Sequence, residues 1–337
     1  MDREQSTVEV PLDALSSERV EEVWADLLKA EQEQAHQGLV RTHTRTLVIL
    51  TAAGGERPDV ARVALSHPGR YITVTVGPTT APRAAVSLLR APGLGAASEL
   101  VDLPLTPRAH DHWAEAVLPL LRPDMPVAGL VTDLGLLEGD AFCELALNLD
   151  TVVLDTRGIS RPSQPWARVF GENPRVTPMD LAWHALQPWR EVTAAAFDPD
   201  DLTALLPALE AVVAVGGPEA DSPATWLHGW LVDRTERQQD EPALEFSRHG
   251  GKSGLRSLEL RFAGDAVCRI AVAGRQLRAE VEVHGRVVHA VHQAWSEPDW
   301  SRLVSDCLAH GYDAVFHNTV RHLVASREHR YEEGTDA

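Results

Sequence analysis

The chain has 337 residues, which is enough for two domains of ordinary size. Hydrophobic residues make up 44% of it, as expected for a globular protein that fills a sizeable core. Lys and Arg total 31 against 49 Asp and Glu, and the resulting net charge of −18 would repel phosphate backbones and anionic lipid. We therefore expect neither nucleic acid nor a membrane as a partner.

The sequence predicts a cytoplasmic protein. The N-terminal residues 1–5 are polar, with no apolar segment behind them of the kind a signal peptide needs. The most apolar stretch, residues 116–131, contains three prolines and two charged residues, which argue against a membrane span. The three cysteines lie far apart in sequence, and a sparse, odd set favours reduced thiols over a disulfide framework.

The first half of the chain predicts a doubly wound, mostly parallel sheet. An amphipathic helix is expected over 17–35, and the continuous apolar run 45–51 is typical of a strand covered on both faces. A helix-like stretch and a second apolar strand follow, which is the opening of an α/β domain. The later elements expected in this half are strands 84–89 and 98–103, helix 109–121, strand 126–132, helix 136–147 and strand 151–155. We assign residues 1–175 to this α/β domain.

Residues 176–337 predict an α+β domain with an antiparallel sheet and flanking, Trp-rich helices. Helix starts are expected where a capping residue precedes a proline, at Thr177-Pro178, Asp198-Pro199 and Ser222-Pro223, with Gln187-Pro188 as a fourth case. Residues 277–284 alternate apolar and polar, as in a sheet with one solvated face. The closing helix, 301–326, is expected to break near Gly311.

Two glycine-rich segments resemble nucleotide-binding loops without meeting their requirements. Residues 93–98 nearly spell a dinucleotide fingerprint, but the residues after them are too strand-like to form the helix that holds the pyrophosphate. Residues 250–253 resemble a P-loop, yet Phe246 stands where the first glycine is needed. We expect turns at both places, and no bound cofactor.

Catalytic and metal-binding patterns are not expected either. His289 and His292 are three apart in a strand, so they point to opposite faces of the sheet. His110 and His112 are two apart and would not face each other on a helix. The sequence contains neither a GxSxG elbow nor an HExxH motif. We predict that the protein is not an enzyme.

The nine tryptophans are the chemistry that remains, and they gather in the second half. Trp226 and Trp230 are four apart on one helix face, which is typical of core packing. Trp183, Trp189 and Arg190 have two interpretations, because Trp and Arg are also the commonest anchors of protein interfaces. Pro188 places Trp189 and Arg190 in a first helical turn that could present both to a partner. These three residues are our candidate partner-binding site.

Five segments in order resemble the glucose-6-phosphate dehydrogenase assembly protein family, OpcA. The most specific is Asp180-Leu-Ala-Trp-His-Ala-Leu-Gln-Pro-Trp-Arg-Glu191, which is similar to the family signature. The others are residues 66–70, 118–127, 225–231 and 308–316. The resemblance implies an assembly factor or allosteric activator that binds glucose-6-phosphate dehydrogenase at the entry to the oxidative pentose phosphate pathway.

The sequence departs from the family at one place and leaves one alternative open. After Val127 the family continues with a Trp-Trp-Pro stretch, whereas this chain reads Ala128-Gly-Leu-Val-Thr-Asp133. The three cysteines match no family motif, so redox control is not carried over. The alternative is an enzyme or sensor that binds a sugar phosphate or nucleotide at the carboxyl ends of the first-half strands. Its site would be lined by Thr51, Gly77, Asp133 and Asp155.

Overall fold

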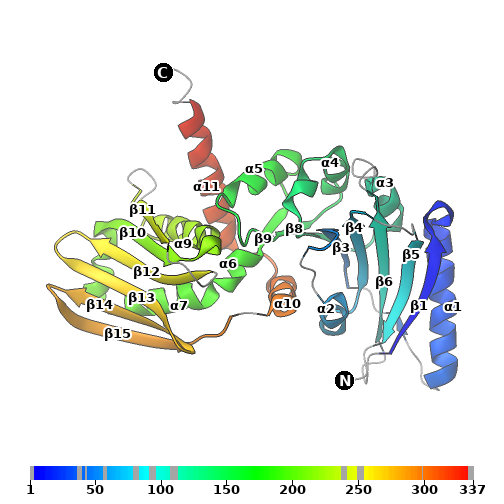
Figure 1. Ribbon diagram of the computed structural model, residues 1–337, viewed down its shortest axis with the longest axis horizontal. Coiled ribbons are helices and arrows are strands. Elements are labelled where there is room, and N and C mark those ends of the chain that lie inside the picture. Colours follow the sequence, from blue (N-terminus) through cyan, green and yellow to red (C-terminus); the bar gives the residue numbers. More distant parts are fainter. Residues whose placement is uncertain are drawn as a thin grey trace. The chain divides into compact units, whose positions relative to one another are not determined.

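The computed structural model divides the chain into two compact units, each assembled from separate stretches (Figure 1). Unit 1 comprises Met1–Asp155, Arg168–Met179 and Trp300–Gly311, and unit 2 comprises Thr156–Ala167, Asp180–Asp299 and Tyr312–Ala337. The structure describes residues 4–35, 40–41, 44–55, 59–78, 83–90, 96–106, 113–236, 241–248, 254–297 and 299–332. The loops expected at 93–95 and 250–253, and residues 110 and 112, lie outside these ranges.

Unit 1 is built on one large, mostly parallel sheet, as the sequence predicted. Its strands lie in the order β1-β5-β6-β4-β3-β7-β8-β9, and β2 pairs with β6. The strands are β1 (Glu4–Pro11), β2 (Val40–Arg41), β3 (Thr46–Ala52), β4 (Arg70–Val76), β5 (Arg83–Arg90), β6 (Ala96–Leu105), β7 (Val127–Val131), β8 (Thr151–Leu154) and β9 (Thr177–Asp180). Residues 47–50 of β3 are all buried, as a strand covered on both faces requires.

The strand order of unit 1 is that of a doubly wound sheet with one substitution. The five parallel strands lie side by side in the order β6-β4-β3-β7-β8. Numbered by their sequence, this is the order 3-2-1-4-5, and the point where successive strands begin to be added on the other side lies between β3 and β7. The link from β4 to β6 passes through strand β5, where a doubly wound fold commonly has a helix. β5 pairs antiparallel with β6 and then with β1, so an antiparallel ribbon extends this edge of the sheet.

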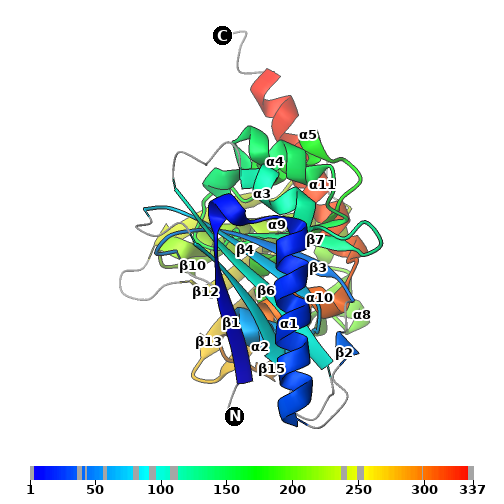
Figure 2. The ribbon, with the colours of Figure 1, turned by 90° about the vertical axis from the view of Figure 1, so that its right-hand side faces the viewer.

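Helices from both ends of the chain pack in unit 1. α1 (Ser17–Ala35) lies along β1 and β5, and its Trp24 indole donates a 3.0 Å hydrogen bond to the Ser87 carbonyl (Figure 2). The other helices of this unit are α2 (Val60–Ser66), α3 (Trp113–Val117), α4 (Asp140–Ala146) and α10 (Trp300–His310), with part of α5 (Ser163–Glu172). α10 packs on α2, where the Asp59 amide donates to the Ser301 hydroxyl at 3.1 Å.

Arg70, the last residue of one family-like segment, forms a buried ion pair in unit 1. Its guanidinium donates to the Glu99 carboxylate at 2.9 Å and to the Leu120 carbonyl at 2.8 Å. It also lies 4.4 Å from the centre of the Trp24 ring. A buried cation needs this degree of compensation, so the segment Ser66–Arg70 is explained by the core of unit 1.

Unit 2 is an α+β layer structure. Its sheet has the order β11-β10-β12-β13-β14-β15; β10 and β11 are parallel and the other neighbours antiparallel. The strands are β10 (Leu209–Gly216), β11 (Ala243–Arg248), β12 (Leu255–Phe262), β13 (Ala266–Ala273), β14 (Gln276–Val283) and β15 (Arg286–Ala294). The helices are α6 (Leu181–Ala185), α7 (Gln187–Ala196), α8 (Asp200–Thr203), α9 (Asp221–Arg234) and α11 (Ala314–Glu332).

Only one face of the unit 2 sheet carries the core. α7 packs on β13, β14 and β15, and α9 packs on β11 and β12. The strand positions that face these helices are apolar and buried, and they include Leu258, Ile270 and Leu277. The break expected near Gly311 is confirmed, since Gly311 has φ +67° and α10 and α11 belong to different units.

The cap-and-proline rule placed one helix start wrongly and two others to within two residues. Thr177-Pro178 lies in strand β9, and the helix that follows begins at Leu181 with Asp180 as its cap. β9 is the last strand of its sheet. Proline is tolerated on an edge strand because its nitrogen, which carries no hydrogen, can face away from the neighbouring strand. The other two starts are shifted: α8 begins after Pro199, and Ser222 lies within α9.

Candidate partner-binding site

The signature begins at Asp180, whose buried carboxylate is the centre of a hydrogen-bond network in unit 2. It accepts hydrogen bonds from the Thr156 hydroxyl at 2.8 Å, the Trp166 indole at 3.0 Å and the Ala182 amide at 2.8 Å. The Thr156 hydroxyl in turn accepts from the Trp226 indole at 3.1 Å. A carboxylate sealed from water needs such donors, because burying an unpaired charge is costly.

The two indoles of this network and the indole of Trp183 pack around one phenylalanine. The Phe316 ring centre is 5.8 Å from that of Trp166, 5.2 Å from Trp183 and 5.2 Å from Trp226, in edge-on or tilted arrangements. Such geometries add to the free energy gained from burial. Trp226 is fully buried, as the sequence predicted, and Trp230 is buried beside it.

Trp183 is one of the three candidate site residues, and it belongs to this core. Its side chain is 1% exposed, and its indole N–H donates to the Asp313 carboxylate at 2.9 Å. The Asp313 carboxylate also accepts from the Phe316 amide at 3.0 Å, at the start of α11. Trp183 therefore ties the signature helix α6 to the start of α11.

Arg190 stacks on Trp183 from the next helix. Its guanidinium carbon lies 3.8 Å from the Trp183 ring centre, and it donates to the Trp183 carbonyl at 2.6 Å. Loss of hydration lowers the pKa of Arg190 to about 10, although Asp313 and Glu191 act to raise it. Arg190 remains a cation at neutral pH, held over an aromatic face where a cation is favoured.

Trp189 corrects our expectation of an exposed first turn. α7 does begin at Gln187 with Pro188 in its first turn, as predicted. However, Trp189 is only 3% exposed, because it starts the apolar stripe that continues at Val192 and Ala196 and packs on the sheet. The sequence contained this spacing of i, i+3 and i+7. Whether a partner touches Trp183, Trp189 or Arg190 stays a prediction.

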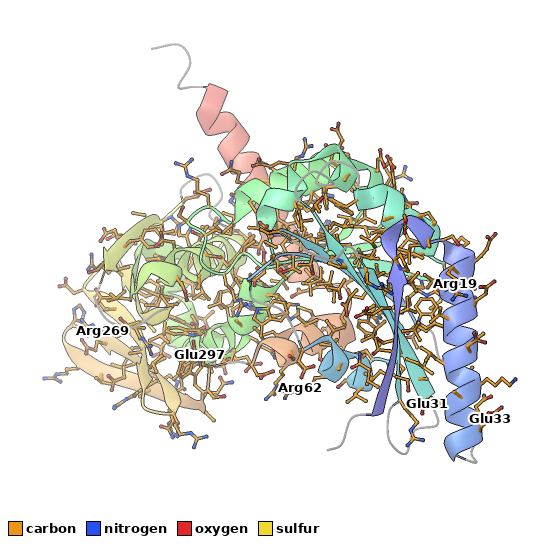
Figure 3. All side chains as sticks on the ribbon, turned by 45° about the vertical axis from the view of Figure 1, so that its right-hand side comes forward. Arg19, Glu31, Glu33, Arg62, Arg269 and Glu297 are labelled. Atoms are coloured by element: carbon orange, nitrogen blue, oxygen red, sulfur yellow. The ribbon has the colours of Figure 1, made fainter. Side chains whose placement is uncertain are left out.

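The solvated face of the unit 2 sheet carries a continuous row of charges, which we call the ladder face. Glu259 joins Arg261 at 2.8 Å and Arg269 at 2.9 Å, and Arg269 also pairs with Glu282 at 2.7 Å. Arg261 reaches Glu245 at 3.3 Å, so the row extends from β11 to β14. Figure 3 marks Arg269 on this sheet.

Partners within the ladder stabilise one another's charged forms. Partial burial of Glu259 opposes its ionisation, yet hydrogen bonds from Arg261 and Arg269 outweigh it and lower the pKa of this carboxyl. The hydrogen bond to Glu282 is the main cause that raises the pKa of Arg269. β10 contributes only Ala211 and Val213 beneath the row, in register with Arg261 and Glu259. The ladder face is thus a pre-arranged pattern of both signs, suited to specific recognition more than to tight binding.

The alternative site was expected at the carboxyl ends of the unit 1 strands, where the structure shows how its four residues are placed. Thr51 is fully buried. A Cβ on Gly77 would come 2.2 Å from the Ala53 Cβ, so the backbones after β3 and β4 are in close contact. Asp133 accepts from the Gly135 amide at 3.1 Å and thereby starts a short helical turn. Of the four residues expected to line that site, these three have structural roles, and Asp155 is partly buried.

Within the described residues, three or more His, Cys, Asp or Glu side chains do not gather in a way that could hold a metal ion. Cys268 and Cys307 are buried, and loss of hydration raises the pKa of the Cys268 thiol to about 12. The described helices include none that is both long and apolar enough to cross a membrane.

Two family models match the chain in order along its length. The model described as the glucose-6-phosphate dehydrogenase subunit N-terminal domain matches residues 60–169. The model of the C-terminal domain of the same subunit matches residues 177–320. The second match contains the whole signature, and the two together cover most of the described chain.

Individual relatives add detail of unequal weight. A protein of Synechococcus elongatus, provisionally described as the OxPP cycle protein OpcA, is 32% identical over 136 residues, which is 40% of this chain and 29% of that protein. The chain therefore matches less than a third of that relative's length.

Two solved structures overlap with this chain at low similarity. Gal80p, a transcriptional regulator of Kluyveromyces lactis, has a TM-score of 0.46 and 7% identity over 85% of this chain and 89% of its own. Myo-inositol 2-dehydrogenase of Lactobacillus plantarum has a TM-score of 0.36 and 9% identity over 84% and 96%. Scores this low support no argument.

Proposed function

The chain belongs to the glucose-6-phosphate dehydrogenase assembly protein family, OpcA, and from this premise we propose that it binds that dehydrogenase and supports its assembly or activity. The role is that of a non-catalytic partner in the oxidative pentose phosphate pathway, acting in the cytoplasm. One observation carries the proposal: the family models match both halves of the chain, so the likeness extends over two folded units and is more than a short motif.

The proposal assigns the signature and the ladder face different roles. Trp183 and Trp189 of the signature are buried, so they support binding by fixing α6, α7 and α11 in unit 2. The ladder face offers exposed charges of both signs, and we propose it as the surface that contacts the dehydrogenase. Direct contact at Trp183, Trp189 or Arg190 is the competing proposal.

The test is reconstitution from purified proteins. We expect the full chain to form a complex with the dehydrogenase that survives gel filtration and raises the yield or the activity of the assembled enzyme. The chain alone should form no NADPH from glucose 6-phosphate and NADP. Absence of a complex, or NADPH formation without the dehydrogenase, would contradict the proposal.

Charge substitutions on the ladder separate the two contact surfaces. Arg269→Glu reverses one charge, whereas the exchange Arg269→Glu with Glu259→Arg restores an internal pair in the opposite direction. If the ladder face is the contact, both variants should weaken the complex. Because the exchange leaves like charges facing Arg261 and Glu282, the melting temperature of each free variant is measured as the control for folding. Normal affinity for both variants would return the contact to the signature residues.

A further inference from the structure

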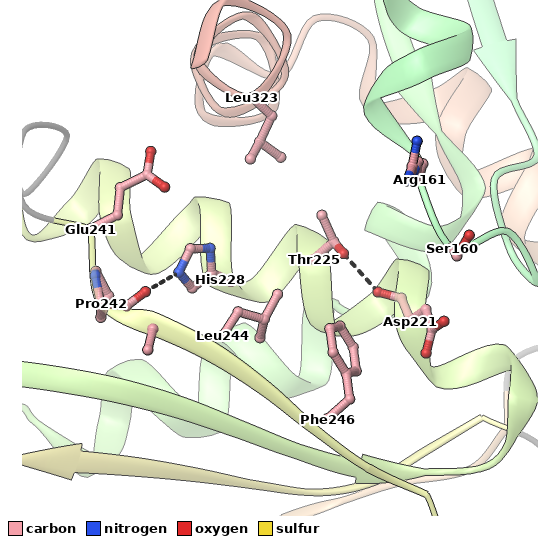
Figure 4. Close-up of a pocket in the computed structure, with 11 residues that line it drawn as sticks. Ser160, Arg161, Asp221, Thr225, His228, Glu241, Pro242, Leu244, Phe246 and Leu323 are labelled. Carbon is pink, nitrogen blue, oxygen red and sulfur yellow. Dashed lines mark hydrogen bonds between the residues drawn. The ribbon is translucent and has the colours of Figure 1, made fainter. Parts of the chain in front are cut away.

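A cavity of about 630 Å³ lies within unit 2, between the crossover helix α9 and the edge strand β11 (Figure 4). α9 contributes Asp221, Thr225 and His228, spaced i, i+4 and i+7 on one face of the helix. At 1.5 Å per residue, the cavity follows α9 for about 10 Å. Leu323 of α11 covers it, and Leu244 of β11 forms part of its floor. Its volume lies in the range of small-molecule sites, about 300–1,000 Å³.

The polar groups at the His228 end already have partners in the protein. The His228 Nε2 atom lies 2.7 Å from the Pro242 carbonyl oxygen, to which it donates. The Glu241 carboxylate lies 3.2 Å from the His322 ring. Toward the other end, the Thr225 hydroxyl donates to the Asp221 carbonyl at 2.9 Å. These contacts fix the walls, so the cavity is a preformed site that a ligand need not first organise.

Ser160 and Arg161 line the same cavity but differ from these residues, because their side-chain donors are not used within the described protein. Among the residues that the structure describes, neither the Ser160 hydroxyl nor the Arg161 guanidinium has a hydrogen bond or an ion pair. Both side chains are exposed. A guanidinium presents N–H donors in a fork that matches the oxygens of phosphate or carboxylate, and a hydroxyl adds another donor. The unused donors of Ser160 and Arg161 suit an oxyanion bound on their side of the cavity, with the Asp221 carboxylate as the negative group at the same end (Figure 4).

Phe246 adds an aromatic surface to the cavity. It pairs with Ala214 in the β10–β11 register, so it points to the core side of the sheet. β11 is the edge strand, and Phe246 remains 44% exposed there. An exposed ring in a cavity that also holds a free guanidinium suits a ligand with a planar ring and an anionic group.

We propose that this cavity binds a mononucleotide, with its phosphate at Arg161 and Ser160 and its base against Phe246. The cavity volume of about 630 Å³ is sufficient for a phosphate, a sugar and a base. Figure 4 shows Phe246 near Asp221, whereas Glu241 and His228 line the other end of the cavity, so neither of these two residues is assigned a contact with the base. The site would make this chain a receptor for a small metabolite, whatever protein it binds.

The experiment is calorimetric titration of the full chain with AMP as the probe. We expect saturable binding to the wild-type chain and a loss of about tenfold or more in affinity for Arg161→Ala and for Phe246→Ala. Arg275→Ala is the matched control, because Arg275 is also exposed in unit 2 but lies outside the cavity, and it should bind AMP normally. Melting temperatures of the two arginine variants should stay at the wild-type value, since both side chains are exposed, and the Phe246→Ala titration is run well below its own melting temperature because part of that ring is buried.

Comparison probes identify which part of the ligand is recognised. Inorganic phosphate should compete with AMP only weakly, and glucose 6-phosphate should bind less tightly than AMP because it lacks a planar base. Absence of saturable AMP binding, equal affinity of the Arg161→Ala variant, or tighter binding of glucose 6-phosphate would each overturn the assignment. The titration contains no dehydrogenase, so its outcome is independent of the proposed assembly role.

Discussion

Asp180 and Trp189 stand nine residues apart in the signature, and both are buried for identifiable reasons. The Asp180 carboxylate is surrounded by donors from residues 156, 166 and 182, whereas Trp189 packs by shape on one stripe of α7. Composition alone favoured Trp189 and Arg190 as interface anchors. The apolar stripe of α7 that buries Val192 also buries Trp189. The environment of Trp189 is therefore set by how α7 packs on the sheet, and not by its residue type.

Truncating Trp189 should therefore behave as a core mutation. Trp189→Ala is expected to lower the free energy of unfolding by about 3–5 kcal/mol, because a large buried indole leaves a cavity. Urea unfolding of the isolated chain measures this, with Trp226→Ala as the reference for a fully buried indole. If Trp189→Ala leaves stability nearly unchanged while abolishing binding to the dehydrogenase, the indole is exposed in solution and is a contact residue.

At the scale of the element, α9 and α11 approach each other at a glycine. A Cβ built on Gly229 would lie 2.8 Å from a methyl carbon of Leu323 and 3.1 Å from the Thr319 methyl. In isolation, glycine within a helix costs about 1 kcal/mol relative to alanine. Gly229 is thus explained by the packing of two helices, and it belongs to the family-like segment 225–231, which lies within α9.

Two glycine-to-alanine substitutions should have opposite effects. Gly229→Ala is expected to destabilise unit 2 by about 1–3 kcal/mol, because overpacking outweighs the better helix propensity. Gly171→Ala in α5 is the matched control: a Cβ there meets nothing within 4 Å, so stability should rise by up to about 1 kcal/mol. Thermal unfolding of both variants gives the signs. A stabilising Gly229→Ala would show that α9 and α11 are not closely packed.

At the scale of the whole molecule, burial of ionisable groups links stability to pH. Cys268 is protonated in the fold up to a pKa of about 12, whereas an unfolded thiol titrates near 9. Above pH 9 the unfolded chain loses this proton first, so its population is favoured and the free energy of unfolding falls as pH rises. The buried Tyr71 hydroxyl, whose pKa is also raised by loss of hydration, acts in the same direction from its usual value of 10 upward.

The wild-type chain should therefore lose stability between pH 9 and 10 more steeply than a Cys268→Ala variant. The difference in slope is expected to approach about 1 kcal/mol per pH unit, since one titrating group contributes at most about 1.4. Urea midpoints at pH 8, 9 and 10 supply the slopes, and the lower overall stability of the variant does not affect the comparison. Parallel slopes would place the thiol in contact with water.

Activation of the dehydrogenase, if it occurs through binding, is constrained by linkage. A partner that tightens the enzyme's affinity for glucose 6-phosphate must itself bind more tightly in the presence of that sugar phosphate, by the same factor. Couplings of this kind are commonly about 1–3 kcal/mol. We expect the affinity of the complex, measured with and without glucose 6-phosphate, to rise accordingly. An unchanged affinity would mean that the chain acts on assembly or on the catalytic step.

The sequence by itself determined the alternating elements of the first half, the antiparallel strands of the second and the position of α1. It could do so because apolar periodicity and turn residues are local properties, readable over windows of ten to twenty residues. It also contained the family motifs, which do not depend on knowing how they pack.

The tertiary structure decided which side chains those elements bury together. Thr177-Pro178 has the local pattern of a helix start, yet pairing at the sheet edge makes it a strand. α10 and α11 read as one helix broken at Gly311, but they pack in different units. The cavity between α9 and β11 is also lined by residues far away in sequence, such as Arg161 and Leu323, and local pattern cannot encode that they lie around one cavity. Burial is a property of the assembled layers, and for this reason Trp189 could be placed on a helix from the sequence, but not assigned to the surface or the core.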